Sequence, residues 1–219
     1  MEVLLPLLGS RMKLIEMVAL LCGVKPVIRQ SYDEDQLPGL YSFCEKHALH
    51  VVVSKFKVIP LDSEQSFSNK GLRVKKTDIR KGQVFVYISK DELKANRTAL
   101  WELRGNHYLL GRELGYPRCC CRFFNEHRHV REQLDNDFEE PVVQNSLGET
   151  FSAVTNIFHR DKDACLLSHF PCSLSCEESV KIGTEVLQAI TEHDFSLAAA
   201  VVDRLKGNQV VHDKQLNFM

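Results

Sequence analysis

Apolar residues recur along the chain at two spacings, one typical of helices and one typical of strands. Residues 11–22 carry Leu14, Val18 and Leu21 at helical spacing, and Gly23 closes the run. The same periodicity predicts further helices over residues 33–48, 93–114 (one long helix or two), 176–190 and 195–205. Runs of β-branched residues predict strands at 50–54, with an extension to 59, and at 84–88, and a shorter strand at 25–29.

Two segments break these periodicities. Residues 62–82 are polar and contain the clearest loop of the chain at 66–71. Residues 132–141 form an acidic connector, and a short helix is predicted over 152–158. The predicted strands therefore lie before residue 90, and the sequence after them has mainly helical periodicity.

This order of elements predicts an α+β fold. We expect a small N-terminal α/β unit with a short sheet over residues 1–90, followed by a mainly helical unit over residues 91–219. A chain of 219 residues can bury one large core or two small ones, so the two units could also form one continuous domain.

Composition and charge are those of an ordinary globular protein. The hydrophobic share is 44%, the charged share is 26% and the net charge is −1, which argues against a protein that coats nucleic acid along its whole surface. The apolar run Met1–Leu8 has only an acidic early charge, unlike a signal peptide, and no stretch is long enough to cross a bilayer. We therefore expect a cytoplasmic protein without a membrane partner, whose cysteines stay reduced.

Candidate chemistry is concentrated in two cysteine stretches, residues 115–121 and 168–179, which hold five of the eight cysteines. Each resembles the start of a helix: Pro117 suits a first helical position, and Ser175 with Glu178 suggests a capping box. The amide groups at a helix start favour thiolate over thiol. We expect the two helix starts to face each other across one small site.

The first hypothesis for this site is metal binding, either in a closed structural site or, if a coordination position stays open, in a metal-dependent enzyme of unknown substrate. His169, Cys172 and Cys176, joined by Cys119 or Cys120, supply four ligands for tetrahedral zinc or for an iron–sulfur cluster. The spacing is not the doubled Cys-x-x-Cys that marks a zinc ribbon.

Two alternatives remain open. A metal-free thiol enzyme acting on an unknown small molecule could use Cys119, Cys120 or Cys176 as nucleophile and His169 or His107 as base, or cycle a Cys172–Cys176 disulfide. A binding module for RNA or phosphate could use the basic segment 70–81, although such charges are more often a solvated loop face. The remaining cysteines are interpreted as buried hydrophobic residues: Cys22, Cys44, Cys121 and Cys165.

The two stretches also resemble a known family. The motifs Leu114-Gly115-Tyr116-Pro117-x-Cys119-Cys120 and His169-x-Pro171-Cys172-Ser173-x-x-Cys176-Glu177-x-Ser179 resemble the prokaryotic family catalogued as domain of unknown function 483. The similarity extends back through Val86–Lys90 towards the N-terminal region. The resemblance carries no activity; it implies that Cys119, Cys120, His169, Cys172 and Cys176 belong to the motif and that Cys121 is incidental.

Overall fold

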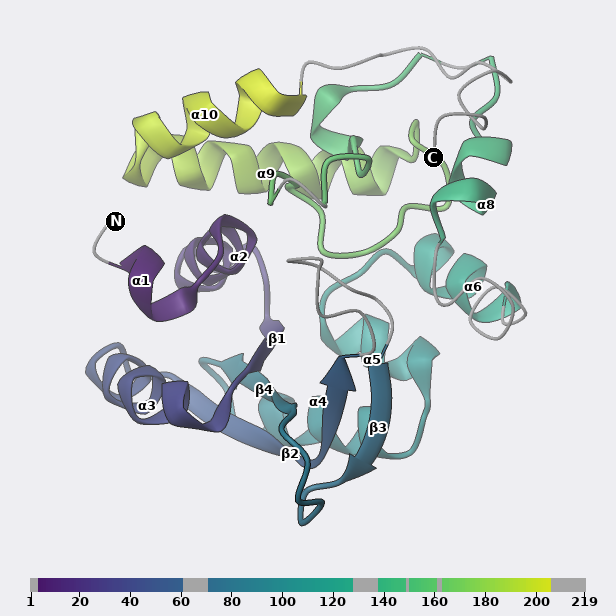
Figure 1. The fold of residues 1–219 in the computed structure, drawn as a ribbon. Coiled ribbons are helices and arrows are strands. Elements are labelled where there is room, and N and C mark those ends of the chain that lie inside the picture. The colour runs from purple at the N-terminus through teal and green to yellow at the C-terminus, as the bar shows by residue number, and fades with distance from the viewer. Residues whose placement is uncertain (1–3, 61–70, 128–137, 149, 161–162, 206–219) are drawn as a thin grey trace.

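The computed structural model of the chain describes residues 4–60, 71–127, 138–148, 150–160 and 163–205. Figure 1 shows the arrangement: helices α9 (Glu177–His193) and α10 (Phe195–Leu205) lie on one side and the sheet lies on the other. Helices α1 (Leu5–Leu8) and α2 (Arg11–Leu21) lie between them. The predicted α+β class is confirmed, with the strands in the N-terminal part and most helices in the C-terminal part.

Four antiparallel strands form one sheet in the order β1-β4-β2-β3. Its strands are β1 (Val27–Tyr32), β2 (His50–Pro60), β3 (Gly71–Lys75) and β4 (Gln83–Ser89). The polar segment 62–82 contains β3, a strand that was not predicted. The loop predicted at 66–71 is wrong for Gly71, the first residue of β3, and its residues 66–70 lie outside the described part of the chain. β3 is an exposed edge strand that pairs only with β2 in this sheet, so its sequence lacks the apolar alternation of a half-buried strand.

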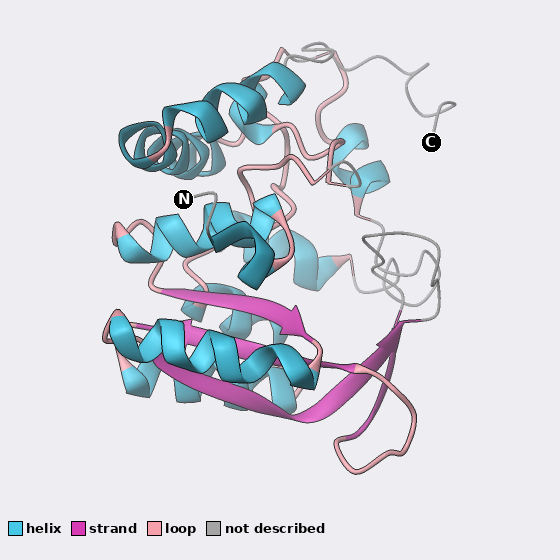
Figure 2. Ribbon diagram, turned by 60° about the vertical axis from the view of Figure 1, so that its left-hand side comes forward, coloured by secondary structure: helices cyan, strands magenta, loops and turns pink. Residues whose placement is uncertain are grey.

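Side chains alternate between the two faces of the sheet, and each face packs on different helices (Figure 2). One face, with Ile28, Val86 and Ile88, joins the core built with α2, α3, α9 and α10. The other face, with Val27 and Tyr87, packs on α4 and α5. One continuous core cluster thus contains residues from before and after residue 90, while the proposed division into two units at that residue stays a prediction.

The N-terminal helices are α1 (Leu5–Leu8), α2 (Arg11–Leu21), the 3₁₀ turn η2 (Glu34–Gln36) and α3 (Leu37–Lys46). The N-cap of α2 is Ser10, and the carboxylate of Asp163 accepts hydrogen bonds from the Ser10 hydroxyl (2.6 Å) and the Arg11 amide (2.6 Å). A residue far along the chain therefore caps this helix and ties the two parts together.

The later helices are α4 (Glu92–Leu103), α5 (His107–Glu113), α6 (Arg118–Glu126), α8 (Glu139–Gln144), η3 (Ala153–Thr155), α9 (Glu177–His193) and α10 (Phe195–Leu205). The run 93–114 is two helices because Gly105, with φ of 68°, ends the first. The acidic connector prediction is wrong for residues 139–141, which begin α8, with Glu139 and Glu140 in the first turn, where acidic side chains suit the helix dipole. Within the described residues, no helix has both the length and the apolar character needed to cross a bilayer.

Candidate metal centre

The first cysteine stretch turns sharply into α6. Leu114 is buried, and Gly115 adopts a left-handed conformation with φ of 81°. A Cβ at Gly115 would come within 2.7 Å of the Pro26 side chain, so both the conformation and the space favour glycine. Pro117 is the N-cap and not the first helical residue, which still leaves Cys119 and Cys120 in the first turn as predicted.

The second stretch enters α9 one residue later than predicted. The N-cap is Cys176 and the helix begins at Glu177, so the capping box expected at Ser175 is wrong. The reason is a tight turn in which the Cys176 amide bonds the Ser173 carbonyl (3.1 Å), while the Cys176 carbonyl accepts the first helical bond from Val180 (2.9 Å). Cys176 therefore sits where the turn ends and the helix starts.

Four thiols from these two stretches meet in one place. Sulfur–sulfur distances are 3.6 Å for Cys119–Cys176, 3.7 Å for Cys120–Cys176 and 3.9 Å for Cys119–Cys120. With Cys172, the four Sγ atoms lie within 4.8 Å of one another and could hold a metal ion. The predicted convergence of the two helix starts is thus present, across a separation of 57 residues between Cys119 and Cys176.

The four thiols differ in their access to solvent. Cys120 and Cys176 are buried, at 2% and 9% exposure, Cys172 is intermediate, and Cys119 is exposed. All eight cysteines are free. The group therefore lies at the protein surface, with one of its sulfur-bearing side chains open to solvent.

Polar donors converge on the most buried thiol. The backbone N–H of Cys172 donates to Cys120 Sγ (3.3 Å), and Ser179 Oγ lies 3.3 Å from the same sulfur. Hydrogen bonds of this kind stabilise a thiolate and fix its position. The role of Ser179 was not recognised from the sequence, although it lies three residues after Cys176 and therefore on the same face of α9.

His169 lies behind Ser179. Its Nε2 is 2.9 Å from Ser179 Oγ, and the residue is 6% exposed. Burial lowers the pKa of His169 to about 3, and the nearby positive charges of Lys25 and Arg160 add to this effect. The ring is thus neutral near pH 7, and it is connected to Cys120 through the Ser179 hydroxyl.

Tyr116 joins the two stretches. Its ring packs on His169, with centroids 4.9 Å apart and planes inclined at 33°, and its hydroxyl donates to the Ser168 carbonyl (3.3 Å). Lys25 bonds the Ser168 hydroxyl and pairs with Glu16 at 2.6 Å. This packing explains why an aromatic residue follows Gly115 at the entrance to α6.

The loop that carries Cys172 is fixed from two further elements. Asn145, at the end of α8, donates to the Cys172 carbonyl (3.0 Å), and the Ser146 hydroxyl accepts from the Leu174 amide (2.8 Å). The hydroxyl of Thr155 in η3 donates to the Leu174 carbonyl (2.6 Å). The position of Cys172 therefore depends on residues that lie between the two cysteine stretches in the sequence.

The thiols influence one another's ionisation. The pKa of Cys176 is lowered because the thiols of Cys120 and Cys172 donate to its sulfur. The pKa of Cys120 is raised by its bonds to Cys172 and Cys176 and by burial. Four thiols in contact cannot all ionise without a compensating cation, because each thiolate opposes the next.

The other cysteines lie outside this group. Cys44 and Cys165 are buried as predicted, and Cys121 is buried with its thiol 3.7 Å from the Tyr116 carbonyl and packed on Gly111. The prediction that Cys22 is buried is wrong: it is exposed, because it caps the C-terminal end of α2.

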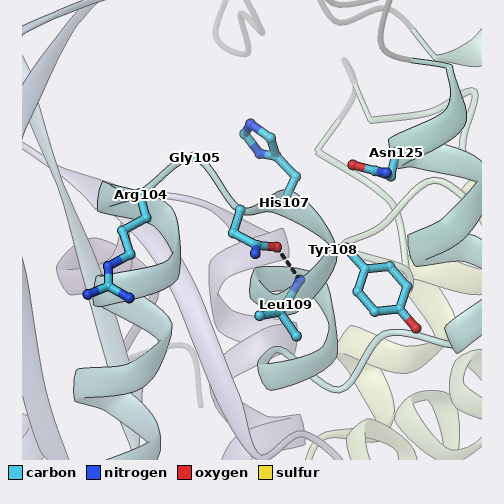
Figure 3. Close-up of a pocket in the computed structure, with 7 residues that line it drawn as sticks. Arg104, Gly105, His107, Tyr108, Leu109 and Asn125 are labelled. Carbon is cyan, nitrogen blue, oxygen red and sulfur yellow. Dashed lines mark hydrogen bonds between the residues drawn. The ribbon is translucent and has the colours of Figure 1, made fainter.

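His107, a candidate base in the sequence analysis, lies in a different place. It begins α5 and lines an open hollow of about 530 Å³, whose other lining residues include Arg104, Tyr108 and Asn125 (Figure 3). Its ring centroid is 6.0 Å from that of Phe124 on α6. The hollow is polar and wide, and its lining contains none of the four clustered cysteines.

Part of the basic segment 70–81 is engaged in contacts within the protein. Arg73 stacks over Phe56 and donates to the Glu102 and Leu103 carbonyls at the end of α4, and Arg80 pairs with Asp78 at 2.8 Å. Lys70 lies outside the described residues. Binding of RNA or phosphate by this segment stays a prediction.

Comparison with known proteins identifies one family. The family described as "Protein of unknown function (DUF483)" matches residues 80–206, more than half of the chain. The matched range includes both cysteine stretches and begins three residues before β4, so β1, β2 and β3 precede it. No curated protein and no solved structure matches the chain.

Proposed function

The chain belongs to the family described as protein of unknown function DUF483, and from its four clustered thiols we propose that it is a metal-binding protein. The ligands in this proposal are Cys119, Cys120, Cys172 and Cys176, and the ion is zinc. His169 supports the site from behind Ser179 and is not itself a ligand. The observation that carries the proposal is the close approach of four sulfur atoms from two distant stretches.

The spacing of the sulfur atoms favours a single ion. Zinc–sulfur bonds of about 2.3 Å directed to tetrahedral corners separate the sulfurs by about 3.8 Å. The distances of 3.6, 3.7 and 3.9 Å lie close to that value. An iron–sulfur cluster places an iron–sulfide frame between its cysteine ligands and holds them farther apart. We therefore favour zinc, or a single iron ion, over a cluster.

Charge compensation supports the same conclusion. Four thiolates around a divalent ion carry a net charge of about −2, which must be stabilised by nearby donors when the site is partly buried. The Cys172 amide and the Ser179 hydroxyl provide such donors at Cys120. Apolar packing alone would not require hydrogen-bond donors directed at a buried sulfur.

Four protein ligands close the coordination sphere of a tetrahedral ion. A closed site is typical of structural zinc, which contributes binding energy to folding. Here the ion would join the start of α6 to the start of α9. The reduced state of all eight cysteines is compatible with the cytoplasm, which we propose as the location.

Elemental analysis of the full chain, purified without added metal from cells grown in metal-replete medium, tests this proposal. We expect one zinc ion per chain. Cobalt titration of the stripped protein should give the visible absorption of a tetrahedral cobalt–thiolate centre. The variants Cys172→Ser and Cys176→Ser should lose zinc, and cobalt added to them should no longer give that absorption.

Cys165→Ser is the matched control, because Cys165 is buried at 2% exposure but lies outside the four-thiol group. It should retain the metal. Absence of zinc and iron from every preparation, together with no cobalt spectrum, would sink the proposal and leave the metal-free thiol alternative. Strong visible absorption with several irons per chain would replace the single ion by a cluster.

A further inference from the structure

The four sulfur atoms of the proposed metal site differ in their hydrogen bonding. Cys120 Sγ contacts the Cys172 N–H and the Ser179 hydroxyl. Within the described residues, the hydrogen-bond partners of Cys119 Sγ are two other thiols, those of Cys120 and Cys176, with no amide or hydroxyl donor among them. Cys119 is also the exposed member of the group.

The lack of amide and hydroxyl donors and the exposure to solvent both make Cys119 a better nucleophile than the other three thiols. A hydrogen bond to a thiolate withdraws electron density from its lone pairs and stabilises it against reaction. A bound cation keeps a thiolate ionised at neutral pH. The sulfur that is exposed and lacks amide and hydroxyl donors is therefore the most nucleophilic of the four ligands, and the other three keep the ion bound when it reacts.

The surface of α6 beside Cys119 carries two arginines, while Glu177 and Glu178 begin α9 next to Cys176. Arg118 precedes Cys119, and Arg122 lies three residues later on the same side of α6; both are exposed. Within the part of the chain that the structure describes, no ion pair is formed by either arginine. An incoming molecule with a negative charge would be attracted to this surface.

We propose that Cys119 is a metal-activated thiolate nucleophile that accepts an alkyl group from a negatively charged alkyl donor. This inference rests on the proposed metal site and adds a reaction to it. The sulfur lone pair forms a carbon–sulfur bond, the bond from that carbon to its leaving group breaks, and the leaving group departs with the electron pair. Cys119 becomes a thioether, and no oxidant or reductant is needed.

The test measures alkylation rates on the zinc-loaded full chain with iodoacetate as the probe. Peptide mapping by mass spectrometry follows each cysteine, and Cys22 serves as an internal reference because it is exposed and outside the group. At pH 7.5 we expect Cys119 to react first and about tenfold faster than Cys22, because a metal-bound thiolate is fully ionised whereas about one tenth of an ordinary thiol is. Removing the zinc should abolish this advantage.

Two variants extend the test. Arg122→Gln should slow the reaction of Cys119 with iodoacetate more than its reaction with neutral iodoacetamide. Cys121→Ser is the matched control, since Cys121 is the next residue but its buried thiol contacts the Tyr116 carbonyl. It should leave the rate at Cys119 unchanged. The alkylation rates of Cys119 and Cys22 are compared within the wild-type protein. That comparison remains valid even if a variant fails to fold.

Several results would overturn the inference. They are reaction of Cys119 no faster than Cys22, first reaction at Cys120 or Cys172, or an equal rate at Cys119 in metal-free protein. Zinc is measured on the same samples, so slow alkylation of a zinc-containing protein removes this inference alone. A protein that binds no metal removes both this inference and the proposed function.

Discussion

The hydroxyl of Ser179 lies 3.3 Å from the sulfur of Cys120. If Cys120 is a thiolate ligand it can only accept, so the Ser179 O–H points to the sulfur and the Ser179 oxygen accepts from His169 Nε2–H, 2.9 Å away. The ligand, the serine and the histidine then form one directed chain. In this chain the neutral state of His169 has a defined tautomer, with the proton on Nε2.

Replacing Ser179 with alanine should weaken metal binding without removing a ligand. Loss of a hydrogen-bonding partner of a ligand lowers metal affinity by about 10- to 100-fold. Competition with a chromophoric chelator measures the change. Thr184→Ala is the control, because its hydroxyl also lies on α9 but bonds the Val180 carbonyl at an exposed position. Equal affinities for the two variants would show that Ser179 does not support the site.

The stability of the metal-free protein should depend on the ionisation of His169. Its pKa is lowered in the folded protein to about 3, from 6.5, by burial and by the nearby positive charges of Lys25 and Arg160. The unfolded chain therefore binds more protons between these values. The contribution of neutral, buried His169 to the free energy of unfolding is fully present above pH 6.5. It is lost as the pH falls towards 3, by about 1 kcal/mol per pH unit.

His169→Gln is the informative variant for this effect, because an amide can still donate to Ser179 and does not titrate. Urea unfolding at pH 4.5, 5.5 and 7.0 compares the two proteins. The difference in unfolding free energy between wild type and variant should shrink, or change sign, as the pH falls. If the unfolding free energies of wild type and variant change in parallel with pH, the loss of stability in acid comes from groups other than His169.

Gly115→Ala should destabilise the entrance to α6. A left-handed conformation costs a residue with a Cβ about 1–2 kcal/mol, and the new atom would also meet Pro26 at 2.7 Å. Gly23→Ala is the matched control: Gly23 follows α2 in the same conformation, with φ of 79°, but has no atom within 4 Å of the added Cβ. Thermal unfolding should show a larger loss at Gly115. Equal losses would mean that Pro26 moves away at no cost.

Glu102, which is buried, anchors α4 to the sheet through an ion pair with the partly exposed Arg29. Its carboxylate accepts two bonds from Arg29 at 2.6 Å and one from the Tyr87 hydroxyl at 2.7 Å. Glu102→Gln should cost about 2 kcal/mol, because it leaves the partly exposed arginine and the buried Tyr87 hydroxyl without a charged acceptor. Glu113→Gln removes the exposed pair with Arg97 and should cost less than about 1 kcal/mol. Chemical denaturation compares the variants, and similar losses would contradict this assignment.

Local sequence rules predicted the features of the site that arise within one segment. Helix-terminating glycine and proline placed Cys119 and Cys120 in a first turn, and the periodicity of residues 176–190 located α9. The ends of α10 agree with the sequence because its buried apolar residues, Ala198, Val201 and Leu205, recur at helical spacing. Each of these features depends on spacing and backbone preference, which can be read from neighbouring residues.

Features that depend on distant partners were not predictable in this way. The edge strand β3 is polar and acquires its conformation from pairing with β2. The N-cap of α9 is Cys176 and not the predicted Ser175, because the Cys176 amide closes a turn on the Ser173 carbonyl. The hydrogen bond between Ser179 and His169 needs the register of α9 relative to the preceding loop, which no local pattern specifies.

The distance of 57 residues between Cys119 and Cys176 has a consequence for biosynthesis. Domains begin to fold from the N-terminal side while the ribosome is still adding residues. α6 emerges with two of the four sulfur atoms, and their counterparts follow only after α8 and η3 have been made. Insertion of the proposed ion would then have to wait for the second cysteine stretch, because the nascent chain carries an incomplete set of thiols until translation has passed Cys176.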